Sequence, residues 1–411
     1  DYLTVNTAYL VTVSDNSATL DELEELAKTL GIKTAGRESV SLKAVNPKLF
    51  VGSGKAADIV LEAKHTGADL IIFDDELSPS QQRNWEELTA IPVIDRRELI
   101  LEIFADHAKT KEAKLQIELA QLEYTLPRLK RAWTHLSRQQ GGSRGTRGEG
   151  EKQIELDRRS ILQRIAKVKR EIENIGGQRD IRRKQRQQNQ TPVASIIGYT
   201  NAGKSSLLNY CTEAEVVTEN KLFATLDPTT REWAMPGGAS LLLTDTVGFV
   251  RKLPHDLVQA FHSTLEESAY ADFLIHLADA SSSEIDSHIA TTREVIAELG
   301  IGEKPLLLVF NKIDKLQSAE ELTLLKRKYP EAVCISVKTG VGLDDFRERI
   351  IRLVREMYTP KKYEFPLSRH DLVAFIHRHG EVLDKEYRDN SISVAAFVPD
   401  YARNILASFA R

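Results

Sequence analysis

The sequence lacks the features that define disulfide-rich and membrane proteins. It has only two cysteines, Cys211 and Cys334, in 411 residues, and their spacing fits neither a disulfide framework nor a metal site. No apolar run reaches the ~18 residues needed to cross a bilayer, so we expect no membrane span. So few cysteines are typical of a reducing compartment, which predicts a cytoplasmic protein. The first residue, Asp1, is not a methionine, so the sequence leaves open a leader that has been removed.

A strong net charge is also missing, since the formal charge is −4 at pH 7. With 41% hydrophobic residues, the chain is long enough for two to four domains with proper cores. The patterns predict four parts. They are an N-terminal α/β domain (1–105), a helical hairpin (106–190), a nucleotide domain (191–358) and a small α+β domain (359–411).

The first part alternates strand and helix patterns, which predicts a small parallel sheet. Strands are expected at Ala8–Val13, Leu49–Val51, Leu70–Phe73 and Pro92–Ile94. The run Gly52-Ser53-Gly54-Lys55 lies before a helical pattern, as a phosphate-binding turn does, but it is shorter than a full phosphate loop. A plain turn and a second nucleotide site, for ATP, both remain open.

The second part carries two leucine- and isoleucine-rich seams at heptad spacing, Leu115–Leu136 and Ile161–Ile175. Two such seams separated by one polar loop predict an antiparallel helical hairpin, with a kink at Pro127. The last part, after Pro360, predicts a strand at Tyr363–Pro366, a helix at His370–His379, a second strand at Ile392–Val398 and a final helix.

The loop at the tip of the hairpin, residues 139–150, contains five glycines and cannot pack a core. Residues 128–186 carry 18 lysines and arginines against 7 acidic residues, which indicates a nucleic-acid partner. A disordered linker and a solvated coiled-coil face are the plainer interpretations. The residues predicted to contact RNA are Arg144, Arg147, Lys152, Arg179, Arg182, Arg183, Lys184 and Arg186.

The third part opens with a phosphate-binding loop. An apolar strand, Val193–Ile197, leads into a G-x-x-x-x-G-K-[ST] motif, and a helical pattern follows. In this motif Lys204 binds the β- and γ-phosphates and Ser205 binds Mg²⁺. The predicted loop residues are Gly198, Tyr199, Thr200, Asn201, Ala202, Gly203, Lys204, Ser205 and Ser206.

The base is predicted to be guanine. The apolar strand Leu306–Phe310 ends in Asn311-Lys312-Ile313-Asp314, and Asp314 can accept hydrogen bonds from the guanine N1–H and amine, which adenine does not offer. Ser336-Val337-Lys338, after another short strand, supplies a third loop at the guanine edge.

Two switch segments are expected between these motifs. The first is Phe223-Ala224-Thr225-Leu226-Asp227, where Thr225 is the preferred second protein ligand of Mg²⁺ and Thr229 and Thr230 are its rivals. The second is Asp245-Thr246-Val247-Gly248, where Asp245 holds Mg²⁺ through water and the Gly248 N–H approaches the γ-phosphate.

The glutamine that orients the attacking water in Ras-type GTPases is missing, because Phe249 follows Gly248. Intrinsic turnover is therefore expected to be slow. Asn201 is a candidate ligand for a K⁺ that would stabilise the γ-phosphate charge. The alternative is that Asn201 only suits the turn. A partner that repositions Phe249 and Arg251 would also complete the site.

These motifs together resemble the HflX family of translation-associated GTPases. The resemblance rests on Gly198–Ser205, Phe223–Thr230, Asp245–Pro254 and Asn311–Asp314, and it covers nearly the whole chain. It implies that Thr225 is the Mg²⁺-binding threonine of the first switch. It also implies that the hairpin loop, with Gly145–Gly148 and Gly150–Gln153, reaches the peptidyl-transferase region of the large ribosomal subunit.

The motifs and the resemblance together predict a monomeric GTPase that uses GTP, GDP and Mg²⁺, with K⁺ as a candidate further cation, and that docks a basic arm on ribosomal RNA. Such a protein either splits, rescues or recycles ribosomes, or acts as a checkpoint in large-subunit biogenesis. Two alternatives belong to other classes, namely an ATP-driven RNA-remodelling enzyme and a signalling GTPase whose hairpin docks on protein.

Overall fold

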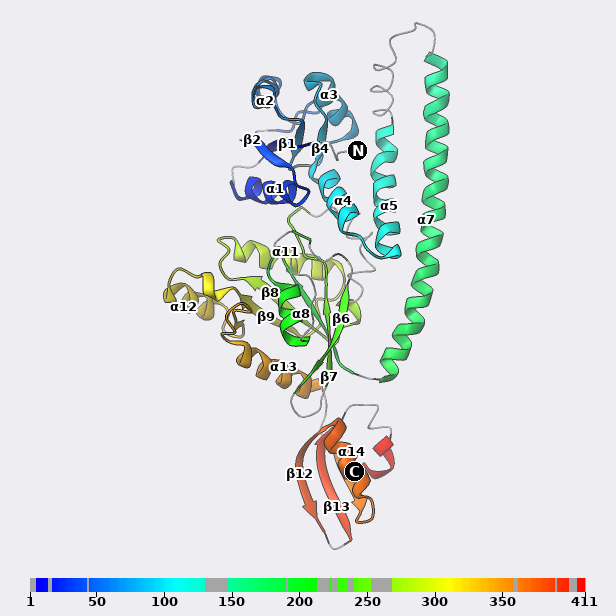
Figure 1. Cartoon of the computed structure of the whole chain (residues 1–411), viewed down its shortest axis with the longest axis vertical. Helices are drawn as coiled ribbons and strands as arrows, with labels where there is room; N and C mark the ends of the chain where they lie inside the picture. Colours follow the sequence, from blue (N-terminus) through cyan, green and yellow to red (C-terminus); the bar gives the residue numbers. More distant parts are fainter. Residues whose placement is uncertain are drawn as a thin grey trace. The chain divides into compact units, whose positions relative to one another are not determined.

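A computed structural model shows how the chain folds (Figure 1). It describes residues 5–13, 17–42, 44–129, 147–189, 191–212, 222–223, 226, 228–235, 240–252, 268–357, 361–388, 390–398 and 405–410. Along 147–153 and 176–189 only the course of the helix is described. The chain divides into two compact units, the first of which runs to Ile175 and includes the short segment around Phe223.

The first unit contains a four-stranded parallel sheet in the order β2-β1-β3-β4. The strands are β1 (Thr7–Thr12), β2 (Lys33–Ser39), β3 (Leu70–Phe73) and β4 (Val93–Asp95). The strand expected at Leu49–Val51 was wrong, because only an isolated bridge between Asn46 and Phe50 forms there. The sheet uses Lys33–Ser39 instead. This segment is the edge strand of the sheet and is partly exposed to solvent. Its sequence is therefore not an apolar run.

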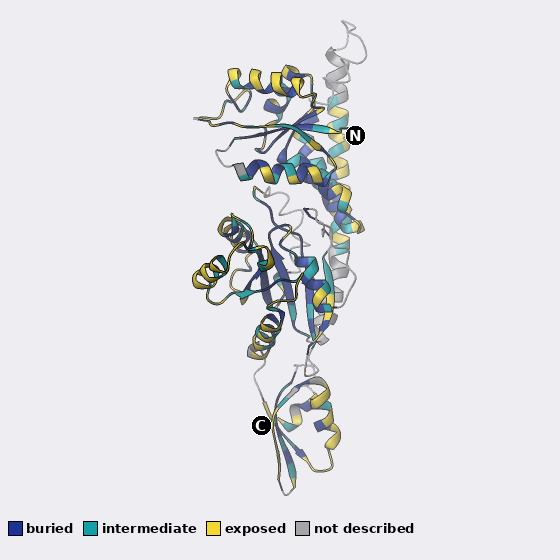
Figure 2. Ribbon diagram, turned by 60° about the vertical axis from the view of Figure 1, so that its left-hand side comes forward, coloured by how far each residue is buried: buried dark blue, intermediate teal, exposed yellow. Residues whose placement is uncertain are grey.

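Four helices pack on this sheet: α1 (Ser17–Thr29), α2 (Ser53–His65), α3 (Pro79–Thr89) and α4 (Arg96–His107). Figure 2 shows the buried residues gathered on the strands and on the inner faces of the helices. Trp85 of α3 is fully buried, its ring lies 4.9 Å from that of Phe73, and its indole N–H donates to Leu49 O at 2.7 Å. Leu49 is thus a core residue without being part of a strand.

The hairpin follows as α5 (Lys111–Thr125), a 3₁₀ turn (Leu126–Arg128) that carries Pro127, and the 43-residue α7 (Arg147–Asn189). A buried polar network joins its base to the sheet. Arg128 donates to Leu77 O at 2.7 Å and lies 3.5 Å from Asp95, and the Tyr124 hydroxyl donates to Asp95 at 3.2 Å. Burial raises the pKa of Asp95, so the Arg128 guanidinium compensates a carboxyl that sits in the core.

The second unit holds a six-stranded sheet in the order β10-β9-β8-β5-β7-β6. Its strands are β5 (Val193–Gly198), β6 (Thr229–Ala234), β7 (Ser240–Asp245), β8 (Phe273–Asp279), β9 (Leu306–Asn311) and β10 (Val333–Cys334). All neighbours pair in parallel except β6, which is antiparallel to β7. The sequence did not predict β6, because its mixed polar residues show no apolar run. The fold class expected from the sequence is confirmed.

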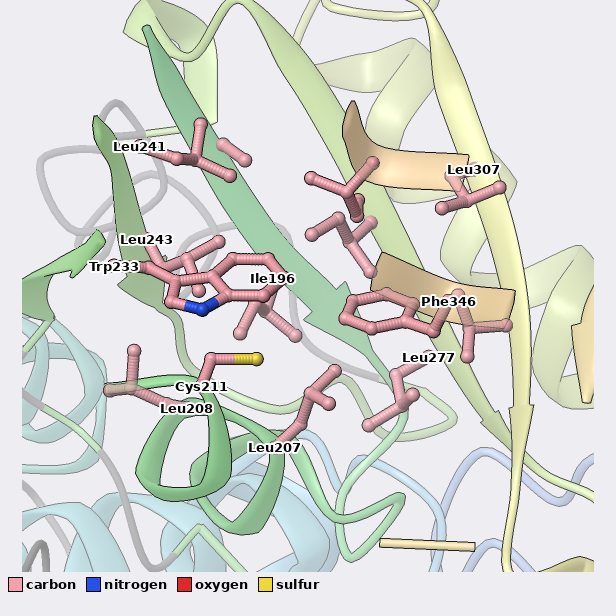
Figure 3. Close-up of a cluster of buried hydrophobic side chains, with 14 of the residues drawn as sticks. Ile196, Leu207, Leu208, Cys211, Trp233, Leu241, Leu243, Leu277, Leu307 and Phe346 are labelled. Carbon is pink, nitrogen blue, oxygen red and sulfur yellow. The ribbon is translucent and has the colours of Figure 1, made fainter. Parts of the chain in front are cut away.

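The helices around this sheet are α8 (Lys204–Thr212), α11 (Ile285–Glu298), α12 (Ala319–Lys328) and α13 (Leu343–Met357). In Figure 3, Leu207, Leu208 and Cys211 of α8 point at the sheet. Trp233 of β6 stacks with Phe346 of α13, with 6.1 Å between ring centroids and 7° between planes. This core holds the helix that starts at the phosphate loop in a fixed position on the sheet.

The C-terminal segment forms an antiparallel sheet in the order β11-β13-β12, with α14 (His370–His379) on one face. The strands are β11 (Lys361–Pro366), β12 (Glu381–Tyr387) and β13 (Ser391–Phe397). The expected final helix is mainly a 3₁₀ turn, Ala407–Phe409, within residues 405–410.

Among the helices that the structure describes, none is both long and apolar enough to span a membrane.

Candidate nucleotide site

The phosphate loop lies between the end of β5 and the start of α8, and two of its glycines are required by the geometry. Gly198 has a φ of +149°, and a Cβ there would lie 2.1 Å from Leu277 O. Gly203 has a φ of +97°, and a Cβ would lie 2.4 Å from Asn311 Nδ2. Both positions combine a left-handed backbone with a close neighbour, so only glycine fits. The loop can therefore close tightly around a phosphate.

Lys204, at the start of α8, is buried beneath this loop. Its Nζ donates to Gly198 O at 3.2 Å and to Tyr199 O at 3.0 Å. Burial lowers the pKa of Lys204 to about 8, and the carboxylate of Asp245 acts in the opposite direction. A phosphate oxygen carries charge and is a stronger acceptor than a neutral carbonyl, so it would draw this ammonium toward itself.

The next residue, Ser205, faces the end of β7. Its hydroxyl donates to Asp245 Oδ2 at 2.7 Å, and Asp245 is fully buried. Hydroxyl and carboxylate oxygens are hard donors, which Mg²⁺ prefers in the company of phosphate oxygens. The pair therefore fits a Mg²⁺ that also binds the nucleotide.

The predicted guanine-binding residues meet at the ends of β9 and β10. Asn311 donates through Nδ2 to Ala202 O at 2.9 Å and accepts from Val337 N at 3.1 Å. The Ser336 hydroxyl donates to Asp314 Oδ1 at 2.6 Å, and this bond lowers the pKa of Asp314. Asn311 thus ties the phosphate loop to the third loop, and Asp314 stays an ionised acceptor suited to guanine.

Sequence reasoning missed the partner of Lys312. Lys312 Nζ lies 2.7 Å from Asp279 Oδ2 and donates to Asn201 O at 2.6 Å. Asp279 is the last residue of β8, the strand beside β9, so both acidic and basic groups reach the same edge of the sheet. The sequence does contain a signal for this partner, because Asp279 ends an apolar strand as Asp245 does. Ile313 follows Lys312 and begins the 3₁₀ turn Ile313–Lys315, and Lys338 lies in the third loop, after Val337.

The second switch is bonded directly to the phosphate loop. Thr200 N donates to Phe249 O at 2.8 Å, and Phe249 N donates to Gly198 O at 3.1 Å. The Phe249 side chain is buried, and the hydroxyl of Thr246 donates to Ile196 O at 2.8 Å. Gly248 is therefore held against the loop from both sides, where Val247 is also buried.

A second contact made by the switch was also missed. The Tyr199 hydroxyl accepts from Arg251 N at 2.8 Å, and its ring stacks on His288 of α11 with centroids 3.8 Å apart. Arg251 also pairs with Glu284. These contacts join the phosphate loop, the second switch and the start of α11, three segments that are far apart in the sequence.

The first switch is described only in part. Phe223 and Leu226 are buried, and Phe223 makes an edge contact with Phe104 of α4. Ala224, Thr225 and Asp227 lie outside the described residues. Of the rival Mg²⁺ ligands, Thr229 and Thr230 begin β6, and the hydroxyl of Thr230 bonds that of Thr244 at 3.0 Å. That bond engages the hydroxyl of Thr230 only, and the choice of Thr225 stays a prediction. Ser206, half-buried, lies in α8.

The side chains predicted to contact RNA all lie outside the described residues. In the part of the hairpin that the structure describes, basic side chains of α7 pair with acidic ones of α5. Arg164 pairs with Glu118, and Lys169 Nζ lies 2.9 Å from Glu123. Some of the basic side chains of the hairpin thus form ion pairs between its two helices. Others, such as Arg158, are exposed.

Comparison with known proteins follows the same division of the chain. Residues 17–105 match the family described as GTP-binding GTPase N-terminal, residues 107–186 the GTP-binding GTPase Middle Region, and residues 193–312 the 50S ribosome-binding GTPase. The chain is 45% identical to GTPase HflX of Akkermansia muciniphila over 96% of this chain and 93% of the relative. It is 46% identical to GTPase HflX of Escherichia coli over 79% of this chain and 76% of the relative.

Among solved structures, the chain is similar to a GTP-binding protein from the archaeon Sulfolobus solfataricus in complex with GDP. The identity is 28% and the TM-score 0.45, over 86% of this chain and 99% of that one.

Proposed function

Since this chain belongs to the HflX family of GTPases, we propose that it binds the large ribosomal subunit and uses the γ-phosphate of GTP to control how its helical arm docks on ribosomal RNA. In this proposal the docked arm splits, rescues or recycles ribosomes. The chain divides functionally into the four parts 1–105, 106–190, 191–358 and 359–411. We also propose that the protein acts as a monomer in the cytoplasm.

One observation supports the nucleotide-binding part of this proposal. Four residues, Lys204, Ser205, Asp245 and Asp314, lie at the same edge of the sheet. In this proposal Lys204 binds the phosphates, Ser205 and Asp245 hold Mg²⁺, and the ionised Asp314 binds guanine. Support for the ribosomal half comes from the matched family, which is described as 50S ribosome-binding, and from the basic composition of residues 128–186.

The hydrolysis step needs help at Phe249, which cannot hydrogen-bond to water. We propose Mg²⁺ bound by Ser205, Thr225 and, through water, Asp245, and K⁺ held by Asn201. Asn201 has a φ of +60°, so its asparagine also suits the turn itself. Turnover at equal ionic strength in KCl and NaCl tests the K⁺ proposal, and equal rates in both salts would contradict it.

The docking step is assigned to the arginines of the hairpin. Replacing Arg144 and Arg147 with alanine is expected to weaken ribosome binding and to flatten its salt dependence, while GTP affinity stays the same. Arg164→Gln is a matched control, since Arg164 already pairs with Glu118 within the hairpin. Equal loss of ribosome and GTP binding in the double variant would mean that the loop is structural.

Sedimentation of ribosomes on sucrose gradients separates the proposal from its alternatives. The protein is added empty, with GDP, GTP, a non-hydrolysable GTP analogue or ATP. Splitting of 70S particles with GTP or its analogue supports the proposal. Binding to large subunits without splitting favours a biogenesis checkpoint. No ribosome binding favours a signalling GTPase, and equal binding in all nucleotide states would overturn the switch.

An ATP-dependent remodelling enzyme would need the turn at Gly52–Lys55. Here Lys55 Nζ of α2 lies 2.6 Å from Glu38 Oε1 of β2, so its charge is already paired within the N-terminal domain. That pairing favours a structural turn. ATP-dependent splitting that survives Lys204→Ala would favour the remodelling enzyme instead.

A further inference from the structure

The third residue of the phosphate loop, Thr200, has a hydroxyl that nothing in the described part of the chain satisfies. The residue is 7% exposed, and its Oγ1 is buried without a hydrogen-bond partner among the described residues. Leaving a buried hydroxyl unpaired costs free energy. The neighbouring Thr246 shows the usual solution, since its hydroxyl donates to Ile196 O. The Thr200 hydroxyl therefore fits a group that arrives with the nucleotide.

Thr200 lies beside two residues that are expected to bind the γ-phosphate, Lys204 and Gly248. A Cβ placed on Gly248 would lie 2.7 Å from Thr200 Cγ2, 2.8 Å from Thr200 Cα and 2.9 Å from Lys204 Nζ. One point in space is thus bordered by the threonine, by the lysine that binds the β- and γ-phosphates, and by the glycine whose N–H approaches the γ-phosphate. The bond from Thr200 N to Phe249 O holds this arrangement in place.

The hydroxyl has the chemistry that this position requires. During hydrolysis the attacking water lies in line with the bond that breaks, and a side chain must orient it. Phe249 stands where that side chain is expected, and its ring is buried and apolar. A threonine hydroxyl both accepts and donates. It can accept a hydrogen bond from the water and donate one to a γ-phosphate oxygen.

We infer that Thr200 is a catalytic residue whose hydroxyl orients the attacking water in place of the glutamine that this chain lacks. The water oxygen bonds to the γ-phosphorus, and the bond between that phosphorus and the β,γ-bridging oxygen breaks. The bridging oxygen keeps the electron pair and leaves as part of GDP, while the water proton passes to a γ-phosphate oxygen. Thr200 ends the reaction unchanged. This inference rests on the proposed GTP hydrolysis.

The test compares Thr200→Val, which keeps the branched shape, with Thr200→Ser, which keeps the hydroxyl, in the full chain. Loss of one such hydrogen bond is expected to lower kcat of Thr200→Val by about 10- to 100-fold. Affinity for GDP and for a non-hydrolysable GTP analogue is expected to stay near that of the parent. Affinity for GDP with aluminium fluoride, which mimics the transition state, is expected to fall together with kcat.

Thr200→Ser is expected to recover most of the lost rate. Thr292→Val is the matched control, since Thr292 is also a buried threonine but donates to His288 O within α11. An unchanged kcat in Thr200→Val overturns the inference. So does an equal loss in Thr200→Ser, which would indicate a steric role, or a parallel loss of GDP affinity, which would indicate a role in binding. Absence of hydrolysis in the parent would instead overturn the GTPase proposal itself.

Discussion

The Ser205 hydroxyl donates a hydrogen bond to Asp245 Oδ2 at 2.7 Å, although 40 residues separate the two in the chain. Ser205 comes from the first turn of α8, and Asp245 is the last residue of β7, the strand that pairs with β5. The pairing of β5 with β7 brings the phosphate loop and the second switch to one edge of the sheet. A hydroxyl and a carboxylate in contact at that edge are the donors that the proposed Mg²⁺ would use beside the nucleotide.

We therefore expect Ser205→Ala to remove the Mg²⁺-dependent part of GTP affinity. The loss of the hydroxyl ligand is expected to weaken binding by about 10- to 100-fold in Mg²⁺, because hydrogen-bond and ligand contacts to charged groups are worth about 1.5–3 kcal/mol. Binding in EDTA should hardly change. Titration of a fluorescent GTP analogue measures both. Thr212→Ala, a change elsewhere on α8, is the control, and equal loss with and without Mg²⁺ would contradict the assignment.

The depressed pKa of Lys204 predicts a pH-dependent affinity for GTP. Because the pKa is lowered to about 8 by burial, the free protein loses this positive charge as the pH rises through 8. Phosphate oxygens favour the charged form, so binding above pH 8 must take up a proton. Affinity is expected to be constant below about pH 7 and to fall by up to about tenfold per pH unit above 8.

Fluorescence titrations between pH 6.5 and 9 check this, and Lys204→Arg, whose guanidinium stays charged, should show no such slope. The same shift stabilises the fold as the pH rises from about 8 toward 10.5, since the unfolded lysine there still holds a proton that the folded one has lost. A GTP affinity that is flat through pH 9 in the parent would show that Lys204 keeps its charge.

Asp314 is expected to set the choice of base. Asp314→Asn replaces a carboxylate that accepts two hydrogen bonds from guanine with an amide that presents a donor. We expect GTP affinity to fall by about a hundredfold or more, since two hydrogen bonds to a charged group are lost. Xanthosine triphosphate, which carries a carbonyl in place of the guanine amine, should bind better to the variant than to the parent. Competition titrations of both nucleotides measure the exchange, and unchanged selectivity would remove Asp314 from the site.

Tyr199 is expected to restrain the second switch through one hydrogen bond. Tyr199→Phe keeps the ring that stacks on His288 but loses the oxygen that accepts from Arg251 N. Hydrogen exchange at the Arg251 amide is expected to rise by about tenfold, the equivalent of a bond worth about 1.4 kcal/mol. His288→Ala removes the stacking partner but keeps the acceptor, so it should affect this amide less. Equal exchange in parent and Tyr199→Phe would show that other contacts hold the switch.

Much of the nucleotide site was predicted because its signals are local. The strands that end in Gly198, Asp245 and Asn311 are apolar runs, which can be recognised in the sequence. The spacing of glycine, lysine and serine in the phosphate loop likewise identifies the loop, because its backbone conformation requires these residues at these positions. The second helix of the hairpin could also be predicted from local spacing. Ile165 and Val168 of its seam are buried, as heptad spacing requires. In each case the residues that carry the pattern are neighbours in the chain.

The sequence by itself determined most of the helices and apolar strands, the phosphate loop, the guanine motif and membership of the family. Only the tertiary structure decided that Lys33–Ser39 completes the N-terminal sheet, that Asp279 pairs with Lys312, and that Tyr199 stacks on His288. It also placed the methyl group of Thr200 against Gly248 and left the Thr200 hydroxyl buried with no hydrogen-bond partner among the described residues. The reason is physical: these contacts join segments far apart in the chain, and they depend on strand order and on which faces pack together. No local pattern of residues encodes those two properties.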